Sequence, residues 1–397
     1  MPRDLSPELK LVALCCSWPP TASSDVRIAT LASRISNWEQ FEALVRHHRV
    51  RPLVHAAIHR TGIDVPKRVA DILKQAAYAE IERSLRQASE CIRLQYEFAH
   101  ESIPMLVIKG APLAALAYNS VAMKESRDID ILVDPEDAVR AASILRMLSY
   151  ELTEPELSEE EFIRFIPHSK EAAFLHTKTG VVTELHWRLV DTGQLLRHVG
   201  AQGPTQDVAL SVGSLATLAN QPLFAYLCLH GASHNWFRLK WLADLNAFLG
   251  TRDEAELERL VGYADTCGAG RCASVAMQLC HDLFAPSWLL PLRNKSYGAT
   301  ISRMLRRNVI KSLNYRGGGM EPLPYTVQWL RVLLAAFFVT ADRGHILAQA
   351  RFLWTAPLDR AKIPLPRGMS FLYHVFRMPS WLWRVTARAI RATKRRA

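Results

Sequence analysis

The sequence lacks the cysteine patterns that would indicate a disulfide framework or a structural zinc site. Its seven cysteines are an odd number, no two are spaced as C-x-x-C, and Cys15 and Cys16 are direct neighbours. Disulfide scaffolds and zinc sites need paired cysteines at regular spacing. We therefore expect reduced, mostly buried thiols, as in a protein of the cytoplasm.

Long apolar segments are also missing. The start of the chain, MPRDLSPELK, has no apolar stretch of the kind that forms the centre of a signal peptide. The most apolar run, residues 332–339, is far shorter than the roughly 20 residues that a membrane-spanning helix needs. The sequence therefore predicts no transmembrane segment and a cytoplasmic location.

The sequence has fewer acidic than basic residues. It contains 38 Asp and Glu and 49 Lys and Arg, which gives a net charge of +11. Such an excess favours an anionic partner, which means a nucleotide, a nucleic acid or a membrane surface. Six of the cations lie in the last fourteen residues, RVTARAIRATKRRA, which contain no acid. The rest of the chain is therefore only mildly basic, with a net charge of +5 after these six are subtracted.

The basic tail, residues 381–397, combines aromatic and cationic side chains. It begins with Trp381 and Trp383 and continues with four arginines at helical spacing: Arg384, Arg388, Arg391 and Arg395. A basic amphipathic helix of this kind lies on an anionic membrane surface or contacts nucleic acid. A solvated terminal helix is the third interpretation. The predicted cytoplasmic location thus includes peripheral association with a membrane.

The hydrophobic period changes twice along the chain. Apolar residues recur at helical spacing over 1–100 and again from about Ser211 onward. Between them, short apolar runs at 104–108 and 129–133 predict strands, and EAAFLH and VVTELHW flank the turn TKTG as a β-hairpin. We therefore expect an α+β fold with a small mixed-sheet core over 101–195, helical regions over 1–100 and 196–380, and the tail 381–397.

Acidic residues interrupt two of the predicted strands. In SRDIDILVD, Asp128 and Asp130 share one strand face. Ile129, Ile131 and Val133 point to the other face. Two adjacent carboxylates repel each other unless a cation lies between them, and Mg²⁺ prefers such oxygen ligands. Glu184 lies among apolar residues in VVTELHW, on the same face as His186. If the two strands are neighbours, three carboxylates converge and can hold two metal ions.

Candidate phosphate-binding residues stand before these acids. Lys109 and Gly110 lie where a strand turns into a helix, a place where glycine allows close approach and the helix offers free N–H groups. Lys109 adds a positive charge. Lys124 and Arg127, in the loop before the acids, either reach a phosphate as well or are solvated loop cations.

The stretch LHGASHNWFRLKWLADL is predicted to be one helix. His230 and His234 then face the same side, but Gly231 stands where a zinc-binding HExxH motif has glutamate. Two interpretations stay open. Either His234 and Lys240 bind the triphosphate or the substrate, or these groups only fix the helix, with Lys240 and Asp244 as an i,i+4 ion pair.

Together these features resemble the polymerase-beta-type nucleotidyltransferase superfamily, and within it a bacterial family often labelled uncharacterised nucleotidyltransferase. The matching segments are HHRVRPLVHAAI (47–58), VIKGAPLAALAY (107–118), SRDIDILVD (126–134), TELHWRL (183–189) and LCLHGASHNWFRLKWLADLNAFL (227–249). At the phosphate turn the chain departs from the superfamily, because Lys109-Gly110-Ala111 replaces Gly-Ser or Gly-Gly and offers no hydroxyl.

The resemblance implies a function. It implies transfer of a nucleoside monophosphate from an NTP such as ATP, with two Mg²⁺ ions, or Mn²⁺, held by Asp128, Asp130 and Glu184. The acceptor is not specified by the sequence. A small molecule or a peptide is the favoured expectation. The alternatives are a toxin-like enzyme that modifies tRNA or protein, and a non-catalytic nucleotide-binding protein with the same fold.

Overall fold

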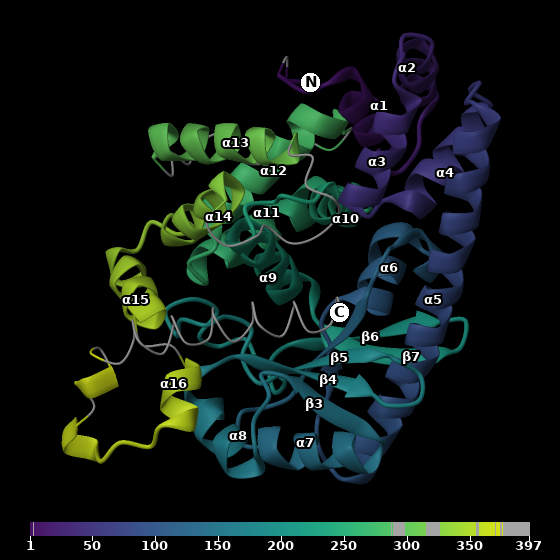
Figure 1. The fold of residues 1–397 in the computed structure, drawn as a ribbon. Helices are drawn as coiled ribbons and strands as arrows, with labels where there is room; N and C mark the ends of the chain where they lie inside the picture. Colours follow the sequence, from purple (N-terminus) through teal and green to yellow (C-terminus); the bar gives the residue numbers. More distant parts are fainter. Residues whose placement is uncertain are drawn as a thin grey trace, which may run out of the picture.

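The protein is an α+β structure in which a small mixed sheet lies between helices from both ends of the chain (Figure 1). The computed structural model describes residues 1–2, 4–286, 288, 298–314, 326–354, 357–369, 371–373 and 375. The predicted basic tail, 381–397, lies outside these residues. Within them, no helix combines the length and the apolar character needed to cross a membrane. All seven cysteines are free and six are buried, as expected.

The first hundred residues form helices, which confirms the prediction for this region. The helices are α1 (Pro7–Cys15), α2 (Ala22–Ala32), α3 (Trp38–His48), α4 (Arg51–Thr61) and α5 (Lys67–His100). The first begins where Ser6 accepts a hydrogen bond from the N–H of Leu9, a typical N-terminal cap. Helix α5 is 34 residues long and runs along one side of the molecule, past the edge of the sheet (Figure 1).

The sheet contains five strands in the order β1-β2-β5-β4-β3. Strands β2 and β5 are parallel neighbours, and the other pairs are antiparallel. The predicted hairpin is confirmed as β4 and β5, and Gly180 in its turn has a positive φ of 70°. The strand bounds are β1 (Leu106–Val107), β2 (Asp128–Leu132), β3 (Tyr150–Glu154), β4 (Glu171–His176) and β5 (Val182–His186).

The two faces of the sheet pack against different helices. Ile129, Ile131 and Leu185 join a core with α7 (Ala138–Met147) and α8 (Glu159–Phe165), which lie below the sheet in Figure 1. Leu132 belongs to a second core that includes α6 (Gly110–Tyr118), α9 (Asn220–Ser233) and α10 (Leu239–Gly250). Because side chains alternate along a strand, Asp128 and Asp130 face this second side.

A second hairpin corrects the prediction that the chain is helical from about Ser211. Strands β6 (Thr205–Leu210) and β7 (Gly213–Leu218) form a two-stranded antiparallel sheet. The side chain of Gln95 on α5 bonds to the backbone of β7 at Ser214 and Ala216. Gln95 is far from β7 in the sequence, so the local hydrophobic period could not predict this contact.

The prediction of one continuous helix over 229–245 is also wrong. Helix α9 ends at Ser233 and α10 begins at Leu239. Between them Asn235 and Trp236 have positive φ angles of 49° and 46°. The Trp236 ring folds back over Gly231, where a Cβ atom would lie only 2.2 Å from the ring. The turn after α9 therefore requires glycine at position 231, because any side chain there would collide with the Trp236 ring.

The remaining described helices complete the C-terminal region. Helix α11 follows α10, and α12 lies in the buried core together with α9 and α10. A 3-10 turn, η1 (Val121–Met123), precedes β2. The bounds are α11 (Glu254–Thr266), α12 (Gly270–Phe284), α13 (Ala299–Leu313), α14 (Val327–Phe337), α15 (Arg343–Trp354) and α16 (Pro357–Lys362).

Candidate active site

Three acidic side chains predicted from the sequence lie on one face of the strand pair β2 and β5. Asp128 and Asp130 lie on β2, and Asp130 stands directly opposite Glu184 on β5. Asp130 is 2% exposed, whereas Asp128 and Glu184 are half-buried. Ligand atoms of Asp130, Glu184 and His186 lie within 4.8 Å of one another. The expected pairing of the two strands is therefore what brings the acids together.

Lys109 connects the phosphate turn to these acids. Its Nζ lies 2.6 Å from Oδ1 of Asp130. Burial acts to lower the pKa of Lys109, but Asp130 and further groups, including Glu184, raise it well above its ordinary value. The next residue, Gly110, has a φ of +61° and opens α6, whose N-terminus has no side-chain cap. The first N–H groups of this helix are therefore available to a ligand.

His186 lies between carboxylates on both of its nitrogens. Its Nε2 is 3.3 Å from Oδ1 of Asp130 and 3.5 Å from Oε2 of Glu184. Its Nδ1 is 3.0 Å from Oε2 of Glu171, which is also paired with Lys170. Burial opposes a charge on the ring, but Glu171 and the other two acids raise the pKa of His186 well above 6.5. The sequence placed His186 on the same face as Glu184 without assigning it a role, and Glu171 was not predicted as a site residue.

The pKa values of Asp130 and Glu184 are shifted in opposite directions by their surroundings. Burial acts to raise the pKa of Asp130, but Lys109 and His186 hold it well below its usual range. Burial raises the pKa of Glu184, and Asp130 and Asp128 add to this effect against the opposing hydrogen bond of His186. Asp130 is thus ionised, and Glu184 takes up a proton more readily than an ordinary glutamate. Carboxylate oxygens this close fit a divalent cation such as Mg²⁺.

The two cations of the loop before β2 lie in different environments. Lys124 is buried and forms an ion pair with Asp244 on α10, which also accepts a hydrogen bond from Tyr118 at 2.9 Å. The proposed Lys240–Asp244 pair is therefore wrong, because Lys240 instead donates to the carbonyl oxygen of Glu125 at 3.3 Å. Arg127 is exposed.

His230 and His234 do share one side, as their spacing indicated, in an aromatic cluster at the end of α9. Their ring centroids are 4.9 Å apart, and His234 stacks on Trp241 at 5.2 Å. Burial, followed by the charges of Lys170 and Lys109, lowers the pKa of His234 to about 4. Burial, followed by the charge of Lys124, lowers the pKa of Lys240 to about 7. Both groups thus belong to the same electrostatic environment as the acids.

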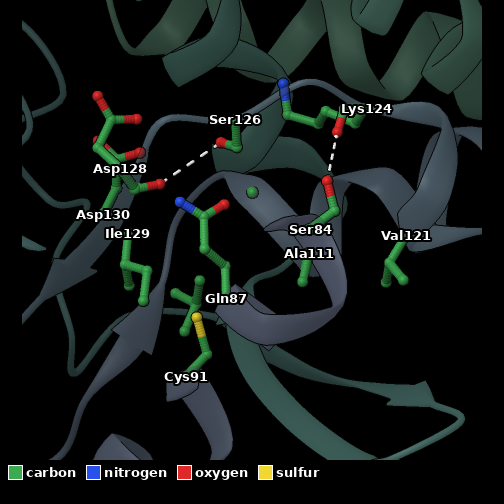
Figure 2. A pocket seen from close by; sticks show the side chains of 12 residues that line it. Ser84, Gln87, Cys91, Ala111, Val121, Lys124, Ser126, Asp128, Ile129 and Asp130 are labelled. Atoms are coloured by element: carbon green, nitrogen blue, oxygen red, sulfur yellow. Dashed lines mark hydrogen bonds between the residues drawn. The ribbon is translucent and has the colours of Figure 1, made fainter. Parts of the chain in front are cut away.

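A pocket lies beside the acids, between α5, the start of α6 and β2 (Figure 2). Asp128, Asp130, Gly110 and Lys124 line it, and so do Gln87 and Ser126, which sequence analysis did not select. Ser126 stands next to the acidic motif in the sequence, so its hydroxyl was a signal that could have been used. Gln87 lies in the middle of a long helix and carries no such signal.

Comparison with known proteins agrees with this arrangement. A search of curated proteins finds no match to the chain. The model of a protein family described as uncharacterised nucleotidyltransferase matches residues 35–285, which is more than half of the 397 residues. The matched range contains β2, β5, the start of α6 and all the acids described above. The protein is therefore a member of this uncharacterised nucleotidyltransferase family.

Proposed function

We propose that the protein transfers a nucleoside monophosphate from an NTP to an acceptor, as a member of the polymerase-beta-type superfamily. One observation carries this proposal: Asp130 and Glu184 stand in register across parallel strands, with Asp128 two residues away on the same face. Three carboxylates in this arrangement suit two divalent ions in phosphoryl chemistry. We assign all three side chains as metal ligands.

The reaction needs one bond made and one broken. The acceptor's hydroxyl oxygen attacks the α-phosphorus, the bond from that phosphorus to the bridging oxygen breaks, and pyrophosphate leaves. Glu184 takes the proton of the acceptor, because burial and the neighbouring aspartates raise its pKa. Two Mg²⁺ ions, when bound, supply charge neutralisation and polarise the reacting oxygens. Asp128 and Asp130 orient the reacting groups.

Once His186 gives up a proton as an ion binds, its imidazole changes the metal preference. Its Nε2 lies among the ligand atoms of Asp130 and Glu184, and the ring is held by Glu171 on its other nitrogen. Nitrogen ligands favour transition metals over Mg²⁺. We therefore propose that Mn²⁺ serves as well as Mg²⁺ in this site.

Phosphate binding draws on several elements. Lys109, Gly110 and the N-terminus of α6 lie beside Asp130, and Arg127 is exposed in the loop that leads into β2. Lys240 and His234 add groups from the C-terminal helices, within the electrostatic reach of Asp128 and Lys109 respectively. Lys124 is committed to Asp244, so we assign it to holding the loop rather than to direct contact with phosphate.

The acceptor is proposed to be a small molecule or a peptide in the cytoplasm. Long nucleic acids need broad basic surfaces, because most of their affinity comes from phosphate contacts. Most of the excess charge of this chain is in the tail, and the rest is only mildly basic. A toxin-like modifier of tRNA or protein is therefore the second candidate for the acceptor class.

The test is pyrophosphate release from each of the four NTPs with Mg²⁺ or Mn²⁺, with and without cell extract. Asp128→Asn and Asp130→Asn should abolish release, and Glu136→Gln, a change at an exposed acid after β2, should not. Mass spectrometry should find a gain of one nucleotide on the acceptor. Full release by both aspartate variants would refute the mechanism. If the protein binds NTP but releases no pyrophosphate even with cell extract, it is a non-catalytic nucleotide-binding protein.

A further inference from the structure

The N-terminus of α6 has no hydroxyl group of its own that could donate a hydrogen bond to a bound anion. Lys109, Gly110 and Ala111 carry no hydroxyl group, and no side chain caps the helix. The free N–H groups and the helix dipole make this end of the nine-residue helix attractive to an anion. Gly110 has a positive φ and only Ser126 Oγ, at 4.0 Å, near the place of a Cβ atom.

Ser126 brings a hydroxyl to this place from another part of the chain. It is 7% exposed, lines the same pocket as Gly110 and Asp128, and bonds weakly to the Asp128 carbonyl oxygen at 3.5 Å. Its Oγ lies 4.0 Å from the place where a Cβ atom of Gly110 would stand, so the hydroxyl faces the space beside this turn. Ser126 thus places beside the helix N-terminus the hydroxyl group that Lys109, Gly110 and Ala111 lack.

Gln87 supplies an independent sign of a ligand. Its side chain is on α5, is 7% exposed, and makes no hydrogen bond within the described part of the chain. Buried amides nearly always have a partner, because leaving one unpaired is costly. Figure 2 shows its amide group pointing into the pocket, toward the space between Ser126 and Asp128. The amide is therefore free to bond to a group that enters this pocket.

The loop that carries Ser126 is held firmly in place. Ser84 on α5 donates to the Lys124 carbonyl oxygen at 3.0 Å. Arg51 on α4 pairs with Glu125 at 2.7 Å and with Glu80 on α5 at 3.1 Å. These contacts fix the loop to the same helix that carries Gln87. A site with fixed donors loses little conformational entropy when a ligand binds.

We propose that Gln87 and Ser126 bind a phosphate of the pyrophosphate half of the NTP at the N-terminus of α6. The Ser126 hydroxyl and the Gln87 amide donate hydrogen bonds to phosphate oxygens, together with the first N–H groups of the helix. The identity of this anion rests on the proposed function. A consequence is that the N-terminal helical region, through α5, forms part of the nucleotide site.

The test compares the affinities of ATP, ADP, AMP and inorganic tripolyphosphate, with Mn²⁺, by calorimetry. Gln87→Leu keeps the volume of the side chain, and Ser126→Ala is a minimal change. Each should weaken ATP and tripolyphosphate binding about tenfold, the usual loss for a hydrogen bond to a charged group, and leave AMP nearly unchanged. Gln75→Leu, at an exposed position of α5, is the matched control. Melting curves identify any variant that fails to fold.

The outcomes separate this inference from the proposed function. Wild type that binds ATP and releases pyrophosphate, with Gln87→Leu and Ser126→Ala equally tight for ATP, would overturn the inference alone. Equal losses for ATP and AMP would also overturn it, because they place the two side chains at the nucleoside or the α-phosphate. Wild type that binds neither ATP nor tripolyphosphate would overturn both proposals.

Discussion

The ammonium group of Lys109 lies 2.6 Å from the Asp130 carboxylate, which also faces His186 and Glu184. This ion pair joins the proposed phosphate turn to the proposed metal site. The pKa of Lys109 is raised well above its ordinary value and that of Asp130 is lowered, so both are charged at neutral pH. Lys109 therefore competes with any metal ion for the same oxygen atom.

Replacing Lys109 by methionine should tighten metal binding while impairing turnover. Two unit charges about 4 Å apart interact by about 4 kcal/mol at an effective dielectric of 20, and a divalent ion doubles this repulsion, so we expect at least about tenfold tighter Mn²⁺ binding without nucleotide. Titration of Mn²⁺ by electron paramagnetic resonance measures this. Lys178→Met, in the exposed β4–β5 turn, is the control. Weaker Mn²⁺ binding by Lys109→Met would mean that Lys109 positions Asp130 instead.

Glu171 should matter although it is not among the three predicted acids. Its Oε2 lies 3.0 Å from His186 Nδ1 and thereby directs Nε2 toward Asp130 and Glu184. Loss of such a partner typically costs about 10–100-fold in metal affinity or activity, and we expect Glu171→Gln to lose this much Mn²⁺ affinity. The same titration with Glu151→Gln, an exposed acid of β3, is the control. Unchanged affinity would leave Glu171 a purely structural residue.

Local sequence pattern predicted the parts of the site that depend on one strand at a time. Asp128 and Asp130 share a face because residues i and i+2 of a strand always do. Glu184 stood out as an acid among apolar residues, and the pairing of β5 with β2 then placed it opposite Asp130. The α+β fold and four of the five strands could be anticipated because the change of hydrophobic period marks where strands replace helices, but β3 (Tyr150–Glu154) was not predicted.

Contacts between distant segments could not be predicted in the same way. Lys124 and Asp244 are 120 residues apart, and nothing in either neighbourhood indicates their pairing. The break between α9 and α10 depends on the Trp236 ring covering Gly231, which helical periodicity does not encode. Gln87 has significance only because α5 packs beside the loop of Ser126.

Nucleotide binding should depend on pH through Lys240. Its pKa is lowered to about 7, first by burial and then by Lys124, so it is charged below pH 7 and neutral well above it. If it contacts phosphate, NTP affinity falls as pH rises through 7, about tenfold by pH 9. Lys240→Arg should flatten this profile because arginine stays protonated, and Lys240→Met should show only the titration of the nucleotide itself. A wild-type profile that matches Lys240→Met would remove Lys240 from the phosphate site.

The buried ion pair between Lys124 and Asp244 should dominate the stability of the loop before β2. Both side chains are 6% exposed, and Tyr118 donates a further hydrogen bond to Asp244. Removing one partner leaves the other charge buried, so Asp244→Ala should lower the free energy of unfolding by about 3–5 kcal/mol. Lys124→Met combined with Asp244→Leu should recover most of that loss, because no uncompensated charge remains. Urea denaturation of wild type and the two variants measures both effects, and a double variant no more stable than Asp244→Ala would show that Tyr118 and packing, not charge, set the cost.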